Sequence, residues 1–176
     1  ELYEVESASC PGPGACGGQF TANTMSMVME VLGLSPAGLN GIPAEDPAKD
    51  EAARRCGELV MDLVRRDVRP SAFVTRRSID NAIAAVAATG GSTNAVLHLL
   101  AIAHEFGIPL DVDEFGRIAD QTPIVADLQP GGRYTATHLY EAGGLGLVLR
   151  ELVGGRRIDG AAPNVDGRTT ADIAAA

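Results

Sequence analysis

The sequence predicts a predominantly helical α/β fold with a few short strands. Apolar residues recur at helical spacing over residues 21–32, 48–66 and about 76–90, whereas only 108–112 and 123–128 have extended character. Aromatic residues make up 4% of the 176 residues and hydrophobic residues 45%, with no tryptophan. We therefore expect an aliphatic core built mainly from packed helices, with the two short strands forming a small piece of parallel sheet.

The first predicted helix covers residues 21–32, where Met25, Val28 and Leu32 fall on one side and Gly33 follows as a C-terminal cap. Residues 35–47 carry three prolines and two glycines, so this stretch is predicted to be a loop. A second helix, residues 48–66, alternates an apolar face with a charged one, and Cys56 lies on the apolar face as an expected core thiol.

A third helix is predicted to open at Thr75 or Arg76 and to stop near the glycine pair at positions 90 and 91. One of Ser92, Thr93 and Asn94 is expected to be the N-cap of the next helix, which runs to about Phe106. The N-terminus of a helix attracts anions through its unpaired amides, so these three residues are also candidates for binding a substrate carboxylate. Capping and binding are compatible, and the sequence leaves both open.

The second half of the chain has weaker signals. Residues 108–112 and 123–128 are the two predicted strands, and a short helix capped by Asp113 is expected between them. Two further helices are predicted at 134–142 and 145–153. Residues 154–176 are glycine-rich and poorly periodic, so they are predicted to be a linker or the truncated start of another domain.

Composition excludes several functional classes. The 14 basic residues against 23 acidic ones give a net charge of −9, which offers no basic surface for nucleic acid. No apolar segment is long enough for a membrane span. The three cysteines, Cys10, Cys16 and Cys56, are too few and odd in number for a disulfide framework, so we expect a reducing, cytoplasmic location.

The segment from Cys10 to Met25 is the most informative one. It combines a Pro/Gly loop, a cysteine at the end of that loop and a helix that starts a few residues later. Glycines let the backbone approach a bulky group, and a helix N-terminus favours negative charge, including that of a thiolate. The spacing of Cys10 and Cys16 matches neither zinc nor ferredoxin patterns. From the residues alone, ordinary loop or core thiols remain the alternative.

Three segments resemble the dihydroxy-acid dehydratase family, which also contains 6-phosphogluconate dehydratase. Residues 10–34 resemble its third cysteine motif, residues 90–103 its Gly-Gly-Ser-Thr-Asn helix start, and residues 124–134 the segment that follows. The resemblance implies an α/β/α N-terminal domain, of which residues 1–153 would be part. It also implies that the chain is a central fragment of a longer enzyme, a homodimer or homotetramer.

The resemblance also implies a cofactor and a reaction. Family enzymes dehydrate 2,3-dihydroxy-3-methyl acids to 2-keto acids in branched-chain amino-acid synthesis, with an iron-sulfur cluster (2Fe-2S or 4Fe-4S) held by three cysteines. Cys16 matches a cluster ligand and Cys10 a non-ligand neighbour. The Mg²⁺ ligands and the catalytic base have no counterpart in these residues, so no catalytic residue is assigned here.

Two alternatives stay open. A sugar-acid dehydratase, acting on aldonates or 6-phosphogluconate, would use the same family machinery on longer substrates. The second alternative is a non-catalytic module that binds a carboxylate or a partner protein at a helix N-terminus. One cysteine cannot hold a cluster alone, and this favours the hypothesis of a non-catalytic module for the chain in isolation.

Overall fold

The computed structural model describes residues 1–9 and 16–176, and this part of the chain is mostly helical. In chain order the elements are α1 (Leu2–Ser9), α2 (Thr21–Val31), α3 (Ala48–Arg65), the 3₁₀ turn η1 (Pro70–Ala72), α4 (Arg76–Ala88), α5 (Asn94–Glu105), α6 (Val112–Asp120), α7 (Ala136–Glu141), α8 (Gly144–Gly154) and α9 (Thr170–Ala175). The helices predicted from apolar periodicity are confirmed as α2 to α8, with ends within a few residues of those expected.

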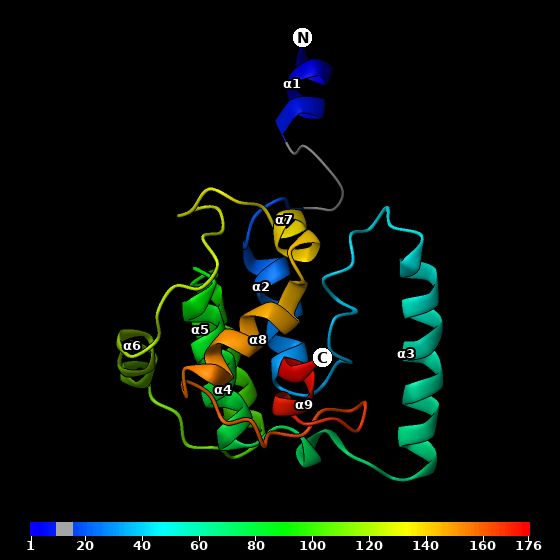
Figure 1. Cartoon of the computed structure of the whole chain (residues 1–176), viewed down its shortest axis with the longest axis vertical. Helices are drawn as coiled ribbons and strands as arrows, with labels where there is room; N and C mark the ends of the chain where they lie inside the picture. Colours follow the sequence, from blue (N-terminus) through cyan, green and yellow to red (C-terminus); the bar gives the residue numbers. More distant parts are fainter. Residues whose placement is uncertain (10–15) are drawn as a thin grey trace.

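Helix α4 lies at the centre of the fold, in contact with α2, α5, α6 and α8 (Figure 1). Thr75 caps its start, where its hydroxyl accepts from the Ser78 amide and Ser78 accepts from the Thr75 amide. Four of its alanines are almost completely buried: Ala82, Ala84, Ala85 and Ala88. Because alanine has no side chain beyond Cβ, neighbouring helices can pack closely against α4 on several sides.

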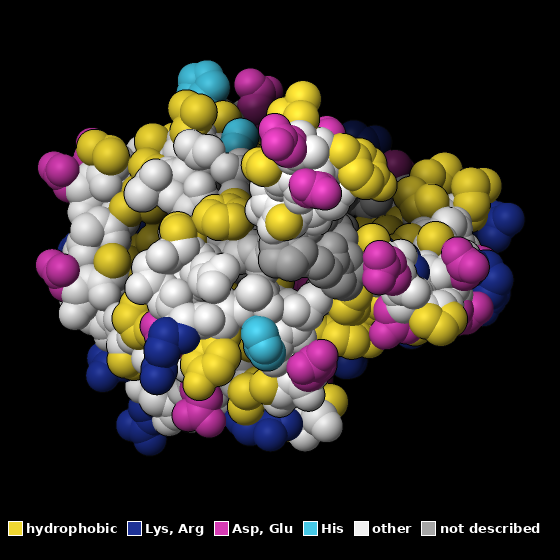
Figure 2. All heavy atoms as spheres, turned by 90° about the horizontal axis from the view of Figure 1, so that it is seen from above, with side chains coloured by type: hydrophobic (Ala, Val, Ile, Leu, Met, Phe, Trp, Pro, Cys, Tyr) yellow, Lys and Arg dark blue, Asp and Glu magenta, His cyan; other side chains and the backbone are white. Residues whose placement is uncertain are grey.

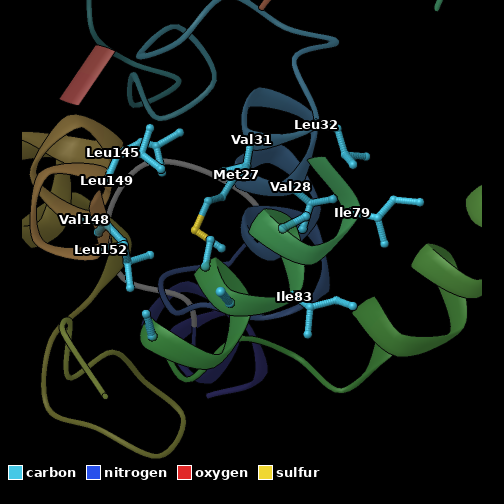
Figure 3. Close-up of a cluster of buried hydrophobic side chains, with 14 of the residues drawn as sticks. Met27, Val28, Val31, Leu32, Ile79, Ile83, Leu145, Val148, Leu149 and Leu152 are labelled. Carbon is cyan, nitrogen blue, oxygen red and sulfur yellow. The ribbon is translucent and has the colours of Figure 1, made fainter. Parts of the chain in front are cut away.

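The core is aliphatic, as the composition predicts, and most of its larger side chains come from helices α2, α4, α5 and α8 and from Leu32 at the end of α2, many of them shown in Figure 3. Those with the least exposure include Val28, Leu32, Ile79, Val148, Leu149 and Leu152. Burying a side chain of this size stabilises the fold by about 1.5 to 3 kcal/mol. This cluster fixes α2 against α4 and α8, and so sets where the N-terminus of α2 lies.

The two predicted strands are wrong for the part of the chain that the structure describes. It contains only isolated bridges, between Leu128 and Tyr134 and between Pro163 and Thr169. The amides of Val125 and Ala126 both donate to the carbonyl of Ala88 at the end of α4, at 2.7 and 3.0 Å. At the start of the other segment, the amide of Ile108 donates to the carbonyl of Ala103 in the last turn of α5, at 2.8 Å. Both segments therefore bond to helix ends, and the small parallel sheet is not observed among the described residues.

Residues 154–176, predicted to be a linker or the start of another domain, pack on the helical core in this structure. The Asn81 side chain donates to the carbonyl of Asp159 and accepts from its amide, both at 2.8 Å. Helix α9 packs against α8 and buries Ile173 and Ala174. The division of the whole protein into domains stays a prediction.

Two helices lie at the periphery. The side chains of α1 are all exposed, and of the eighteen residues of α3 only Ala52 is buried. Helix α3 forms one flank of the molecule, joined to the rest through its connecting loops (Figure 1). Among the helices of the described residues, none combines the length and apolar character needed to cross a bilayer.

Candidate functional site

Cys16 lies in a backbone turn that the rest of the fold holds on two sides. Its side chain is half-buried. The side-chain amide of Asn23, in the first turn of α2, donates to the carbonyls of Cys16 and Gly18 at 2.9 and 2.7 Å. The Gly17 carbonyl between them accepts from the amide of Ala136 at 2.8 Å. All three carbonyls of residues 16–18 are therefore hydrogen-bonded to the scaffold.

The turn is closed against the segment around Gln129. The backbone amide of Gln19 donates to the backbone carbonyl of Gln129 at 2.7 Å. A Cβ on Gly18 would lie 2.8 Å from that same carbonyl oxygen, closer than real side chains come. Glycine at position 18 is thus required by the close approach of two backbones. This contact joins the cysteine motif to the third family-like segment, residues 124–134.

Gln19 anchors the turn in the interior. Its side chain is 2% exposed, and its amide lies 3.5 Å from the Thr89 hydroxyl and 3.6 Å from the Met27 sulfur. The Gln19 carbonyl accepts from the hydroxyl of Thr24 at 3.0 Å. Buried polar groups need such partners, since each one left unpaired costs about 1 to 3 kcal/mol. The cysteine turn therefore rests on the ends of α2 and α4.

The predicted substrate-binding residues Ser92, Thr93 and Asn94 lie at the start of α5. Thr93 is the N-cap, which confirms that one of the three has this position, although its side chain makes no capping bond among the described residues. Instead, the Ser92 hydroxyl accepts a hydrogen bond from the backbone amide of Asn94, at 3.2 Å. Ser92 is half-buried, whereas Thr93 and Asn94 are exposed.

Helices α2 and α5 meet at their N-termini through hydroxyl and amide groups. The Asn94 side-chain amide donates to the Thr21 hydroxyl at 2.7 Å, and that hydroxyl lies 3.4 Å from the Ser92 hydroxyl. The Ser92 backbone amide donates to the Thr24 hydroxyl at 2.9 Å. The structure therefore brings the Gly-Gly-Ser-Thr-Asn segment to the cysteine motif, at the same end of the helical body.

Thr21, Asn23 and Gln19 have central positions here, and no local sequence pattern indicated a role for them. All three lie in the segment that resembles the third cysteine motif, so the motif itself was the available signal. The partners of Gln19 and Thr21, at residues 89, 92, 94 and 129, are distant in sequence, which is why local patterns could not find these contacts. Cys10 lies outside the described residues.

A cavity of about 460 Å³ lies beside the cysteine turn, between α2 and the α7–α8 corner. Gln19, Asn23, Glu30, Tyr140 and Leu145 are among its lining residues. Its size is in the range of small-molecule sites. Seen from the end of the molecule where α1 lies, hydrophobic and charged side chains are interspersed on the surface (Figure 2).

Glu30 is the buried carboxylate of this cavity, at 3% exposure. Burial raises its pKa above the usual value, while hydrogen bonds from the backbone of the loop at residues 38–41, and the charge of Lys49, oppose the rise. The amides of Gly38 and Asn40 donate to its two oxygens, each at 2.7 Å. Both oxygens are engaged, so Glu30 holds the loop after α2 in place.

The donor set near Cys16 is that of a single cluster ligand. Within residues 1–9 and 16–176, no three His, Cys, Asp or Glu side chains come together in a group that could hold a metal ion. Cys56, the predicted core thiol, is half-buried on the peripheral helix α3. An iron-sulfur cluster needs about four donors. Cys16 could therefore supply one such donor, and the described residues around it provide no complete set.

Comparison with known proteins agrees with the three motifs. Over residues 1–173 the chain matches the family described as dihydroxy-acid/6-phosphogluconate dehydratase N-terminal. It is 55% identical over 175 residues to a dihydroxy-acid dehydratase of Roseiflexus sp. (strain RS-1). The aligned region covers 99% of this chain and 31% of the relative.

Two other relatives named dihydroxy-acid dehydratase give the same picture. The protein of Koribacter versatilis is 56% identical over 174 residues, covering 99% of this chain and 30% of that relative. A protein of Thermus thermophilus is 54% identical over 172 residues, covering 98% of this chain and 31% of that relative. The chain thus spans slightly less than a third of the length of these curated relatives. With three motifs joined around Cys16 and a family match over nearly its whole length, the chain belongs to the dihydroxy-acid/6-phosphogluconate dehydratase family, in the N-terminal domain.

Proposed function

We propose that the chain is part of a hydro-lyase that dehydrates 2,3-dihydroxy-3-methyl acids to 2-keto acids in branched-chain amino-acid biosynthesis. One structural observation carries the proposal: three family segments far apart in sequence are joined by hydrogen bonds around Cys16. The names of relatives at about 55% identity agree with it. Because the chain spans about a third of those relatives, the activity belongs to the whole protein.

Cys16 is proposed as one ligand of an iron-sulfur cluster, of 2Fe-2S or 4Fe-4S type. Its half-buried position at the end of a glycine-containing turn suits a thiol that contacts a bulky inorganic group. When bound, the cluster would supply a Lewis acid for the departing hydroxyl. We place the Mg²⁺ ligands outside this chain.

Ser92, Thr93 and Asn94 are proposed to bind the substrate carboxylate. The exposed side chains of Thr93 and Asn94 and the half-buried hydroxyl of Ser92 offer donors at the start of the twelve-residue helix α5. A helix N-terminus favours an anionic ligand. The hydrogen bond from Asn94 to Thr21 would hold the carboxylate site at a fixed separation from the cysteine turn.

The finer predictions about the whole protein belong to the same proposal. We propose an α/β/α N-terminal domain that includes residues 1–153, with residues 154–176 leading toward a following domain although they pack on the same core. The other proposals are a small dihydroxy acid as substrate, a homodimer or homotetramer as assembly, and the cytoplasm as location.

A sugar-acid dehydratase is the second candidate function. It is favoured by the family description, which includes 6-phosphogluconate dehydratase. It shares the cluster and the Cys16 assignment, and differs only in substrate length. The two candidates are separated by substrate, so one assay can compare them.

The test is a chimera in which this chain replaces the matching segment of the Thermus thermophilus dihydroxy-acid dehydratase, to which it is 54% identical. We expect the purified chimera to contain iron and acid-labile sulfide and to dehydrate 2,3-dihydroxy-3-methylbutanoate. Cys16→Ser should remove most of the iron and the activity, whereas Cys56→Ser, the matched control on α3, should leave both unchanged.

Three outcomes would count against the proposal. Iron content that survives Cys16→Ser would reject Cys16 as a ligand. Activity on 6-phosphogluconate alone would favour the second candidate. A folded, iron-containing chimera without any dehydratase activity would favour a non-catalytic binding module.

A further inference from the structure

The side-chain amide nitrogen of Asn23 donates to the turn that carries Cys16. Its amide nitrogen has two hydrogens, and the two carbonyls that it contacts, those of Cys16 and Gly18, lie at 2.9 and 2.7 Å. Asn23 is the third residue of α2, a position from which a side chain commonly reaches back to the N-cap amide. Here Phe20 is the N-cap and provides no side-chain cap within the described chain. The amide of Asn23 thus holds the turn and not the end of its own helix.

These hydrogen bonds also set the direction of the backbone amides. In a planar trans peptide, the carbonyl oxygen and the following N–H point in opposite directions. Since the Cys16 carbonyl points to Asn23, the amide of Gly17 points away from Asn23. Likewise the Gly17 carbonyl accepts from Ala136, so the Gly18 amide points away from Ala136. The orientation of these two amides is thus fixed by the groups that hold the carbonyls.

We propose that Asn23 is a positioning residue for Cys16: its amide fixes the peptide planes of residues 16–18, and with them the place and direction of the thiol. This inference rests on the proposed role of Cys16 as a cluster ligand. Groups that hold a metal ligand from behind orient it for binding. Asn23 lies on α2, and the core fixes the position of that helix. The turn is therefore anchored to a rigid element.

The test measures thiol labelling in the 176-residue chain, where no cluster is required. Iodoacetamide labels Cys16 and Cys56, and mass spectrometry of tryptic peptides follows each rate separately. Cys10 and Cys16 share one tryptic peptide, since Lys49 is the first basic residue, so all variants also carry Cys10→Ser. Cys56 on α3 is the internal reference.

Asn23→Asp replaces both donors by an anion that faces two carbonyl oxygens. We expect the labelling rate of Cys16, relative to Cys56, to rise about tenfold because the turn opens locally. Asn23→Ala removes the hydrogen bonds without adding a charge, and should raise the ratio less. It also keeps the proposal testable should the charged variant fail to fold, as circular dichroism would show.

Asn164→Asp is the matched control. Asn164 also donates from one amide nitrogen to two carbonyls, those of Glu30 and Ser35, at 3.1 and 2.9 Å, but at the other end of α2. We expect it to lower the urea midpoint while leaving the labelling ratio of Cys16 to Cys56 within about twofold of the parent.

Each outcome decides between positioning and general stability. Equal ratios in the Asn23 variants and the parent would overturn the proposal, and so would a parallel rise at Cys56, which indicates general unfolding. The labelling experiment does not require the cluster. The role of Cys16 as a ligand is tested separately by the iron content of the chimera. A tenfold rise at Cys16 with no loss of iron on Cys16→Ser would leave Asn23 as the residue that fixes the turn and would reject Cys16 as a cluster ligand.

Discussion

Glu114 is a carboxylate whose pKa its surroundings lower strongly. The guanidinium of Arg76 holds it, and the backbone amide of Asp111 donates to it at 3.1 Å. Together, with Arg76 as the largest cause, they lower the pKa of Glu114 to about 2. The pair joins the first turn of α4 to the first turn of α6, so a single carboxylate links two helices.

The first prediction follows from the sign of this shift. A carboxylate with a lowered pKa in the folded state stabilises the fold above its unfolded pKa, here 4.5, and that contribution disappears as the pH falls toward 2. Glu114→Gln should therefore lower the free energy of unfolding near neutral pH, by an amount that shrinks below about pH 4. Urea unfolding of the 176-residue chain across this pH range measures it.

Asp120→Asn is the control on the same helix. Asp120 is exposed at the end of α6 and makes no ion pair with the described residues. Its variant should change stability little at any pH. A Glu114→Gln effect of constant size from neutral to acidic pH would show that the ion pair with Arg76 is not its origin.

At the scale of elements, the end of α2 receives the C-terminal segment at Gly33. This glycine has φ +81°, the left-handed conformation that commonly ends a helix. A Cβ there would clash with the carbonyl oxygen of Pro163, and the amide of Val165 donates to the Gly33 carbonyl at 2.9 Å. The helix terminus is therefore also a docking point for residues 163–165.

The second prediction compares two glycines with similar backbones. Gly38 has φ +88° but open space around its Cβ position. Gly38→Ala should lower the free energy of unfolding by about 1 kcal/mol, the cost of a left-handed backbone. Gly33→Ala should cost about 3 kcal/mol, because overpacking against the Pro163 carbonyl adds to that strain. Denaturant midpoints measure both, and equal losses would mean that residues 163–165 do not dock at Gly33.

Helices with strong apolar periodicity could be predicted from the sequence, because their core faces are continuous patterns within the segment. Helix α9 was missed because residues 154–176 show no clear apolar periodicity, although Thr169 and Asp172 form a capping box. Asp111, and not the predicted Asp113, caps α6. The prediction of two strands was wrong because the sequence of a short extended segment does not determine whether its amides bond to another strand or to the end of a helix.

The candidate site was predictable in part. Cys16, Ser92, Thr93 and Asn94 came from motifs, and the structure places the last three at the start of α5 as expected. The connection of residues 92–94 to the cysteine motif through Thr21 and Thr24 was not predictable, because those hydrogen bonds depend on how α2 and α5 pack. The binding roles themselves stay predictions.

At the scale of the whole molecule, the central helix α4 and the peripheral helix α3 differ in the fraction of their residues that is buried. Eight residues of the thirteen in α4 are buried, against one of eighteen in α3. Three apolar residues of α3, Val60, Met61 and Val64, are 50 to 67% exposed. A helix with so little burial contributes little to the cooperative unit.

The third prediction is therefore a difference in hydrogen exchange. Amides of α4 should exchange only through global unfolding, whereas those of α3 should exchange at least about tenfold faster by local opening. Mass spectrometry of peptic fragments from the 176-residue chain gives both rates. The same protection in both helices would mean that α3 unfolds together with the core.

The long sequence separation of the contacts around Cys16 also has a consequence during synthesis. The hydroxyl and amide partners of Thr21 are 71 and 73 residues away, and the backbone partner of Gln19 is Gln129. At typical rates of about 5 to 20 residues per second, the ribosome makes Gln129 on the order of ten seconds after Gln19. During that interval the nascent chain carries Cys16 without the contacts to residues 129–136 that close its turn, so the thiol stays open to oxidation or to stray metal until those residues are made.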